Sequence, residues 1–500
     1  MQLAVKRFSA NGVLYGLLAF AATAPVWIVK HPPLQDLPLH AATIRIVKSI
    51  HDPAYGLDRY FTLTLGRTQY VLYYLVGAFL ATFVGVVAAN VALVSAYLGG
   101  TVLAMRALLC ALGRDERLCL LVVPLLFNVM FLYGLFPFLL GIPVMFWALA
   151  TAVRHFEGTG RGPGVLLAAL AVVLFYSHIF PFGIFCIGFA AMFPWASPRR
   201  WVRCAAPVVP AALLLVWWTT FTSAGRLTSG AATDNARDPM LAVDDAITAL
   251  PMWFTNLFRD QSDELVLIAL AAVVVASIGL SVGDSDRARP SARGYALLPL
   301  ACMALYFVLP QGHGYIWLIA QRFPILFAMT AIPLLRIPRG LRGALVTAGA
   351  LVVGAAAIAN TCAHFIRFEV REVGDIDDQI AGMEPGRKVC ALIFDKTSSV
   401  VVNQPFMHFG SYYQVSKGGV VMFTYAGYAH WPVDFKPGQY PPPGGPARPR
   451  WEWQPEAVSM AEIYPYYDYV LTRGPGFRTP PKGTYHLKSR SDRWTVWERD

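Results

Sequence analysis

The segment that decides the fold is residues 11–45, which read NGVLYGLLAFAATAPVWIVKHPPLQDLPLHAATIR. Its first part, residues 11–29, is an apolar run that is long enough to span a bilayer and longer than the core of a usual signal peptide. Lys6 and Arg7 precede it. We therefore expect an uncleaved helix with a cytoplasmic N-terminus, followed by a polar loop, residues 30–69, on the outer face.

The composition of the whole chain predicts a membrane protein. Hydrophobic residues make up 56% of the 500 residues and charged residues only 14%, whereas soluble proteins carry about 25% charged residues. This composition excludes a single water-soluble fold and an intrinsically disordered chain. Seven cysteines in 500 residues are too few for a secreted fold that depends on disulfide bonds.

The positive charge is a topology signal. The formal net charge is +11, and the excess lies in short loops between apolar runs. This is the positive-inside pattern of polytopic membrane proteins. No basic stripe with interleaved aromatic residues is present, so no nucleic acid partner is expected. The basic clusters are Lys6-Arg7, Arg154-His155, Arg199-Arg200, Arg287-Arg289 and Arg336-Arg339.

Residues 70–153 decide how many times the chain crosses the bilayer. They contain four apolar runs, but the basic loops on either side require an odd number of crossings. We therefore expect residues 70–112 to cross once and to form an interfacial or re-entrant piece near Gly99-Gly100. This gives about eleven spans, with thirteen as the alternative. Later spans are predicted at 165–177, 180–196, 203–222, 264–283, 295–310, 316–335 and 342–363.

The composition changes at Phe365, after which no run could span a bilayer. Short strand patterns there predict a small mixed α/β domain on the outer face. The fold class expected is an α-helical polytopic membrane protein, residues 1–364 with outer loops 30–69 and 223–263, followed by an extracytoplasmic α/β domain, residues 365–500. The elements predicted in this C-terminal domain are strands at 389–394, 469–471 and 494–498 and a helix at 405–414.

The first outer loop carries the strongest functional signal. Asp36 is predicted at the N-cap of a helix because Pro38 suits a first helical turn. Residues 40–50 have the spacing of a helix that lies along the membrane surface. Asp36, His40 and Arg45 would then lie at the lipid–water boundary. The alternative is that Asp36 only caps the helix and His40 is an ordinary interfacial residue.

Three further residues are candidates. Arg322 lies inside an apolar run, and a charge within a membrane indicates function, although it can also reach out to the headgroups. His313 is on the adjoining outer loop and is expected near the same cavity. His178 ends an outer helix, where a histidine is more often an interfacial residue than a ligand. The aromatic segments 407–413 and 464–469 are interpreted as core packing rather than as sugar-binding surfaces.

These features resemble the GT-C superfamily of integral-membrane glycosyltransferases. The run Asp36-Leu-Pro-Leu-His40 is similar to the Asp-x-x-x-His pattern of some bacterial members, and residues 135–141 and 176–178 are similar to their second and third outer-face segments. The resemblance implies a multi-pass protein of the bacterial cytoplasmic (inner) membrane. It also implies transfer of a sugar from a polyprenyl-phosphate donor to a glycan, lipid or protein acceptor on the outer face.

The resemblance also implies roles for residues. Asp36 would act as general base on the acceptor hydroxyl, with His40 beside it, or as the ligand of a divalent cation such as Mg²⁺ or Mn²⁺. No second acidic residue is adjacent to Asp36, so a metal requirement stays open. Arg322, with Arg45 or Arg59, would bind the donor phosphate. His178 and His313 would be possible substrate-binding residues.

Two other functions remain as alternatives. A transporter or lipid flippase would show internal repeats and paired broken helices, and no repeat is evident. A non-catalytic scaffold with a partner-binding outer domain would not depend on Asp36 or Arg322. Motifs of hydrolases, nucleotide-binding proteins and dehydrogenases are absent from the sequence.

Overall fold

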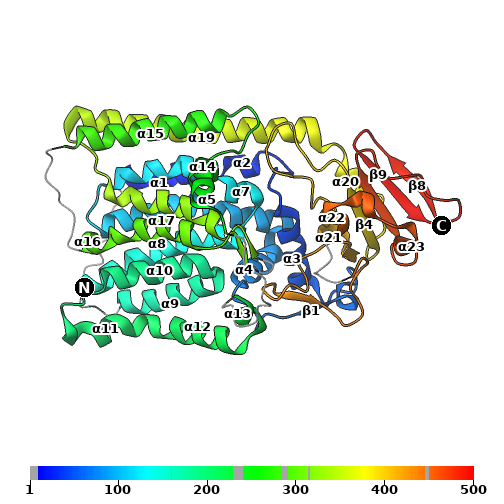
Figure 1. Cartoon of the computed structure of the whole chain (residues 1–500), viewed down its shortest axis with the longest axis horizontal. Coiled ribbons are helices and arrows are strands. Elements are labelled where there is room, and N and C mark those ends of the chain that lie inside the picture. The colour runs from blue at the N-terminus through cyan, green and yellow to red at the C-terminus, as the bar shows by residue number, and fades with distance from the viewer. Residues whose placement is uncertain are drawn as a thin grey trace.

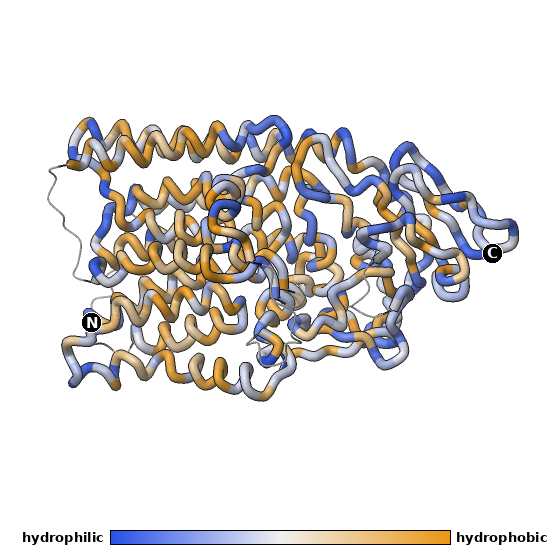
Figure 2. The backbone as a smooth tube through the Cα atoms, viewed as in Figure 1, coloured by the Kyte–Doolittle hydropathy of each residue, from blue (hydrophilic) through white to orange (hydrophobic). Residues whose placement is uncertain are grey.

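The computed structural model describes residues 10–158, 160, 162–228, 240–282, 291–313, 316–444 and 450–500. The chain is mostly helical, and its helices run roughly parallel along the long axis, with a mixed sheet at one end (Figure 1). The apolar residues are concentrated in the helical part, and the sheet end is much more polar (Figure 2). The basic pairs Lys6-Arg7 and Arg287-Arg289 lie outside the described residues.

Five of the described helical segments are long and apolar enough to cross a membrane. They are α5 (Val86–Ala111), α8 (Phe136–Glu157), the segment Pro198–Phe221 that contains α12 (Val209–Phe221), α15 (Ser262–Leu280), and Gly340–Val373, which contains α19 (Gly340–Phe368). Shorter apolar helices are α1 (Ala10–Ala21), α4 (Leu72–Val84), α9 (Gly162–Ser177), α10 (Ile179–Met192) and α17 (Leu297–Val308). The chain therefore has several membrane-length helices, and the count of eleven spans stays a prediction.

The break predicted near Gly99-Gly100 is wrong. The helix α5 is continuous through this pair, and the chain turns instead at Gly85, between α4 and α5, where φ is +81°. A Cβ atom on Gly99 would lie 2.9 Å from the carbonyl oxygen of Ala19. The glycine is therefore needed for the close approach of α1 to α5, which local sequence cannot distinguish from a helix break.

The next apolar run, residues 118–133, is a series of short helices. These are η2 (Glu116–Val122), α6 (Val123–Leu126) and α7 (Val129–Tyr133). The side chain of Asn128 accepts a hydrogen bond from the backbone of Phe131 and so caps α7. The chain then turns at Gly134, where φ is +85°, a conformation that favours glycine. This turn lies directly beneath the candidate site.

A helix is present where the sequence predicts one in the first outer loop. The helix α3 (Leu37–Ser49) is almost wholly buried. It packs between α4 and α21 (Ser411–Lys417) of the C-terminal domain. The helix is thus present as predicted, and the C-terminal domain covers most of it, although Lys48 stays exposed; its position along the membrane surface stays a prediction.

The C-terminal domain, which follows α19, is built on one five-stranded sheet. Its strand order is β5-β4-β7-β9-β8, with β5, β4 and β7 parallel and β9 antiparallel to its neighbours. The strands are β4 (Lys388–Ile393), β5 (Val420–Val421), β7 (Tyr469–Arg473), β8 (Tyr485–Arg490) and β9 (Trp494–Arg499). The three predicted strands are thus present, whereas the predicted helix 405–414 begins only at Ser411.

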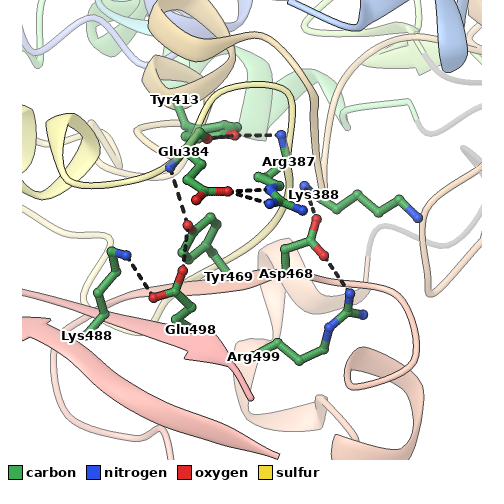
Figure 3. Close-up of polar contacts among 9 residues, drawn as sticks. All are labelled: Glu384, Arg387, Lys388, Tyr413, Asp468, Tyr469, Lys488, Glu498 and Arg499. Atoms are coloured by element: carbon green, nitrogen blue, oxygen red, sulfur yellow. Dashed lines mark hydrogen bonds and ion pairs between the residues drawn. The ribbon is translucent and has the colours of Figure 1, made fainter.

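Polar contacts join neighbouring strands of this sheet at one end of the strands (Figure 3). Asp468 accepts a hydrogen bond from the backbone of Lys388 at 3.0 Å and pairs with Arg499 at 2.7 Å. The hydroxyl of Tyr469 donates to Glu498 at 2.8 Å. Side chains therefore connect neighbouring strands in addition to their backbone hydrogen bonds. These contacts stabilise the domain that carries the loops reaching the helical bundle.

The first outer loop is joined to the C-terminal domain. The short strand β1 (Phe61–Leu63) pairs with β6 (Val433–Phe435) in antiparallel register. Arg67 pairs with Asp434 at 2.7 Å. The helix α19 continues past the boundary predicted at residue 364, to Phe368. Helical bundle and C-terminal domain therefore share an interface, and the candidate site lies there.

Candidate active site

A cavity of about 640 Å³ lies between the helical bundle and the C-terminal domain. Residues predicted from the first outer loop, from 176–178 and from the run around Arg322 all contribute to its wall. The C-terminal domain supplies the rest, and this contribution was not predicted. The titratable side chains of the wall, tyrosines apart, are Asp36, His40, His178, Arg322, His408, His430 and Glu452.

The position of Asp36 depends on the turn at Gly134. Asp36 lies at the N-cap of α3, and its backbone N–H donates to the carbonyl of Tyr133 at 3.2 Å. A Cβ atom on Gly134 would lie 2.9 Å from that backbone nitrogen. Only glycine therefore fits both the backbone conformation and the space below Asp36.

The side chain of Asp36 faces the cavity and does not cap its helix. The hydroxyl of Tyr425 donates to Oδ2 at 3.2 Å, and Nε2 of His408 lies 3.2 Å from Oδ1. The side chain is 10% exposed. The alternative that Asp36 is only a helix cap thus finds no support in its contacts.

His408 lies between two carboxylates. Its Nδ1 is 2.5 Å from Oε1 of Glu452, and its Nε2 faces Asp36. Both contacts are ion pairs by distance, although the atoms are not aligned as hydrogen bonds. Burial lowers the pKa of His408, but the charges of Glu452 and Asp36 outweigh burial, so this pKa is raised. Burial raises the pKa of Glu452 against the opposing effect of His408. We call Asp36, His408 and Glu452 the acidic end of the cavity.

His40 is held on both ring nitrogens. Nε2 lies 2.9 Å from the carbonyl oxygen of Gly134, and Nδ1 lies 2.9 Å from the hydroxyl of Tyr74. A carbonyl only accepts, so Nε2 carries the proton and Nδ1 accepts from the tyrosine. The ring therefore supports the turn beneath Asp36. This geometry favours a positioning role over the predicted catalytic one.

Arg322 enters the cavity from the start of a helix rather than from within a span. The predicted span 316–335 is replaced by a strand, β3 (Ile316–Trp317), the 3₁₀ turn η6 (Ala320–Arg322) and the helix α18 (Phe323–Ala331). The guanidinium donates to the carbonyls of Leu318 at 2.8 Å and Trp317 at 3.0 Å. The hairpin that β3 forms with β2 (Gly312–His313) takes up the first residues of the predicted span, so α18 begins only at Phe323, which hydropathy alone does not resolve.

Arg322 and His178 face each other with hydrogen-bond donors on both sides. Nδ1 of His178 accepts the backbone N–H of Phe180 at 3.1 Å, capping α10. A neutral imidazole has one acceptor nitrogen, so its Nε2 carries the proton. This N–H faces Nη1 of Arg322 at 2.9 Å, and a guanidinium has no acceptor. The pair therefore presents two converging donors, which an anionic oxygen would satisfy.

His430 completes this basic end of the cavity, which we define as Arg322, His178 and His430. Burial lowers the pKa of His430, and the charge of Arg322 lowers it further, so the ring is neutral. Its Nδ1 has no hydrogen-bond partner among the described residues. The ring of Tyr70 lies edge-on to both histidines, with centroids 4.7 Å from His178 and 5.8 Å from His430.

Three predicted residues do not reach the cavity wall. Arg45 donates to the carbonyl of Val415 and lies over the ring of Tyr55. Arg59 is exposed on a short 3₁₀ turn of the outer loop. His313 bonds the carbonyl of Leu227 at 2.7 Å. The prediction that Arg45 or Arg59 joins Arg322, and that His313 shares its cavity, is therefore wrong. Arg45 packs against the C-terminal domain, Arg59 lies at the surface, and His313 is held by Leu227.

The described residues do not fit a divalent cation. No group of three or more histidine, cysteine, aspartate or glutamate side chains is arranged to hold a metal in the described ranges. Asp36 offers one carboxylate, and the charges of Glu452 and Asp36 raise the pKa of the neighbouring His408, which disfavours the neutral ring that a metal would need. Mg²⁺ and Mn²⁺ prefer several oxygen ligands. We therefore derive no step through a metal ion.

Comparison with known proteins shows a shared fold. No family model and no curated protein matches the chain. The crystal structure of ArnT from Cupriavidus metallidurans in the apo state matches with a TM-score of 0.55 and 11% identity over 97% of both chains. The structure of ArnT bound to undecaprenyl phosphate gives a TM-score of 0.41 and 12% identity over 98% of both chains. At this identity, the first match shows an ArnT-like fold and nothing finer.

Proposed function

We propose that the chain is a membrane glycosyltransferase that moves a sugar from a polyprenyl-phosphate donor to an acceptor hydroxyl. The observation that carries the proposal is a single cavity with a buried carboxylate at one end. At its other end, two hydrogen-bond donors converge that have no acceptor among the described residues. The GT-C resemblance of the sequence and the ArnT-like fold support it. ArnT itself has been crystallised with undecaprenyl phosphate, and we propose a lipid of that class as the ligand here.

The chemistry is a direct displacement. Asp36 accepts the proton of the acceptor hydroxyl, whose oxygen attacks the anomeric carbon of the donor sugar. The bond from this carbon to the phosphate oxygen breaks, and its electron pair remains on the departing phosphate. Arg322 and the Nε2–H of His178 stabilise the charge that develops there. Attack from the side opposite the phosphate inverts the configuration of the sugar.

The wall between the two ends is suited to a lipid-linked sugar. It carries aromatic and aliphatic side chains from both parts of the chain, including Leu135, Phe138, Tyr428 and Trp431. Aromatic faces stack against sugar rings, and aliphatic surface accepts the first units of a prenyl chain. A phosphate-linked sugar also carries its own leaving group, which agrees with the absence of nucleotide-binding motifs from the sequence.

The test is donor cleavage by the purified protein in lipid nanodiscs. We expect one member of a panel of radiolabelled polyprenyl-phosphate sugars to release polyprenyl phosphate in the presence of acceptor. Asp36→Asn should lower the rate by about 10²- to 10⁴-fold, the usual contribution of a general base. Asp52→Asn, an exposed carboxylate of the same outer loop, is the matched control and should keep the wild-type rate.

Two results would overturn this function. One is a full rate in a folded Asp36→Asn variant, which would remove the proposed base. The other is movement of the intact donor between leaflets without cleavage across the whole panel, which would favour a transporter. Circular dichroism and gel filtration in detergent show whether each variant is folded before its rate is measured.

A further inference from the structure

The acidic end contains a feature that the displacement alone does not require. Glu452, His408 and Asp36 lie in series, with contacts of 2.5 Å and 3.2 Å across the two ring nitrogens. The side chains of His408 and Glu452 are each 3% exposed. Two carboxylates and one imidazole are thus buried together, although a single general base would need only Asp36.

The three groups come from distant parts of the chain. Asp36 belongs to the first outer loop, His408 precedes α21, and Glu452 lies on α22 (Arg450–Trp453). The ring of His408 is stacked on Phe423, with centroids 5.6 Å apart and planes at 16°. This stacking fixes the ring plane. The fold of the C-terminal domain therefore sets the orientation in which His408 faces Glu452 and Asp36.

The charges explain why a second carboxylate is useful. An imidazolium beside Asp36 alone would stabilise the carboxylate and weaken it as a base. A carboxylate on the far side of the ring offsets this effect: with both carboxylates ionised and the ring protonated, the group of three carries one net negative charge. That charge takes up the one proton released by the acceptor hydroxyl. Without Glu452, Asp36 would still be oriented but would hold a proton less readily.

Orientation is the other effect. The Nε2 side of His408 lies against Oδ1 of Asp36, and the hydroxyl of Tyr425 donates to Oδ2. Each oxygen thus has one neighbour in the protein and keeps lone pairs for a ligand in the cavity. The carboxylate cannot rotate without losing both contacts, which holds it ready for the substrate hydroxyl.

We propose that Glu452 and His408 are positioning residues that hold the carboxylate of Asp36 in place and preserve its strength as a base. The inference rests on the proposed function and assigns the C-terminal domain a part in the reaction itself. His408 acts on Asp36 directly, and Glu452 acts through His408. Neither residue exchanges a bond with the substrate.

The kinetic test compares Glu452→Gln and His408→Gln with wild type in the donor-cleavage assay. We expect Glu452→Gln to lower kcat at least tenfold with KM for the donor within twofold, and to move the acid limb of the pH–rate profile to lower pH. Glu452→Asp should recover part of kcat. The charged and titratable groups that face His408 are Asp36, Glu452, Tyr425 and, farther off, His40, and Lys396 lies near Glu452.

His486→Gln is the matched control. His486 also lies between two carboxylates, Asp500 at 2.8 Å and Glu498 at 3.6 Å, but on the exposed surface of the sheet. Its loss should leave kcat and the pH profile unchanged. An unchanged kcat and pH profile in Glu452→Gln, with both variants folded, would overturn the inference while leaving Asp36 as the base.

A measurement without substrate separates the two proposals. In ¹⁵N-histidine NMR of the wild-type protein, the signal lost in His408→Gln reports the ring of His408. We expect an imidazolium at about pH 8 in wild type, above the ordinary histidine pKa, and loss of the ring proton at a lower pH in Glu452→Gln. A neutral ring in wild type would overturn the inference. The imidazolium signal would support it even if no donor on the panel is cleaved, a result that would count only against the proposed function.

Discussion

At one end of the cavity the imidazole of His408 has an anion on either side, whereas at the other end the imidazole of His178 faces the guanidinium of Arg322. The acidic end is complete as it stands, because the imidazole of His408 has a carboxylate on each side. The basic end is incomplete, because the two facing donor nitrogens, 2.9 Å apart, have no acceptor among the described residues. The difference indicates which end is prepared for a charged ligand: an anion completes the basic end, whereas the acidic end needs only a hydroxyl.

The two ends also differ in origin. Arg322 and His178 are held by helix starts within the bundle, and their hydrogen bonds to the backbone are local in the chain. Asp36 reaches its partners only through the C-terminal domain. Changes at the basic end should therefore act mainly on ligand binding, and changes at the acidic end mainly on the rate and on its pH dependence.

Beyond the loss of Asp36 itself, the largest effect should come from Arg322→Gln. It removes the charge that offsets the departing phosphate, and we expect kcat/KM to fall by about 10²-fold, the usual cost of losing one such donor. Arg59→Gln, an exposed arginine outside the cavity wall, is the control and should stay near wild type. Donor titration and initial rates measure both. Equal losses in the two variants would contradict the assignment of the basic end.

Gly134→Ala should have the next largest effect, at the acidic end. The added methyl group meets the backbone nitrogen of Asp36 at 2.9 Å in a residue with φ of +85°. We expect a loss of about 1–3 kcal/mol in stability from backbone strain, and a lower kcat with KM for the donor unchanged. Gly66→Ala has open space around its Cβ and serves as control. Thermal unfolding and rates are the measurements, and a rise in KM alone would contradict the prediction.

His40→Gln should have a smaller effect, because a glutamine amide can still donate to the carbonyl of Gly134. We expect kcat to fall about tenfold or less, roughly 1.4 kcal/mol, with no change in the shape of the pH–rate profile. His40→Ala should cost more, since it leaves that carbonyl and the Tyr74 hydroxyl unpaired. A loss as large as that of Asp36→Asn would instead make His40 a catalytic residue.

The smallest effect should be the pH dependence of stability in His408→Gln. The pKa of His408 is raised in the folded protein, so its stabilising contribution is fully present below its ordinary value of 6.5 and is lost as pH rises through the raised pKa. The unfolding free energy of wild type should exceed that of the variant at about pH 6, by on the order of 1 kcal/mol, and the gap should shrink at alkaline pH. A gap that widens with pH would contradict the ion-pair description.

Part of the site was predictable because its residues break local patterns. Asp36, His178 and Arg322 are polar groups set in apolar surroundings, and the cost of burying them indicates function from sequence alone. The same argument applies to His408, which stands between Met407 and Phe409, yet the segment 407–413 was interpreted as core packing. That interpretation holds for Phe409 and Tyr413, which are buried, and is wrong for His408, which lines the cavity.

The other site residues that sequence patterns do not predict are those whose partners lie far away in the chain. Glu452 and His430 lie in loop-like stretches of ordinary polarity, and only the tertiary fold brings them to Asp36 and Arg322. The order of apolar runs predicted the helical bundle, and alternating patterns predicted strands in the C-terminal domain. Neither pattern contains information on which loop meets which, so the burial of α3 and the displacement of Arg45 could not be foreseen.

The pairing of β1 with β6 has a consequence for biosynthesis. A ribosome completes the first outer loop long before it reaches residues 433–435, so this strand stays unmatched while the intervening helices are inserted. Its partner arrives only with the last stretch of the nascent chain. A truncated product thus leaves the loop of Asp36 without its strand partner and without His408, so we expect premature termination to remove the proposed activity.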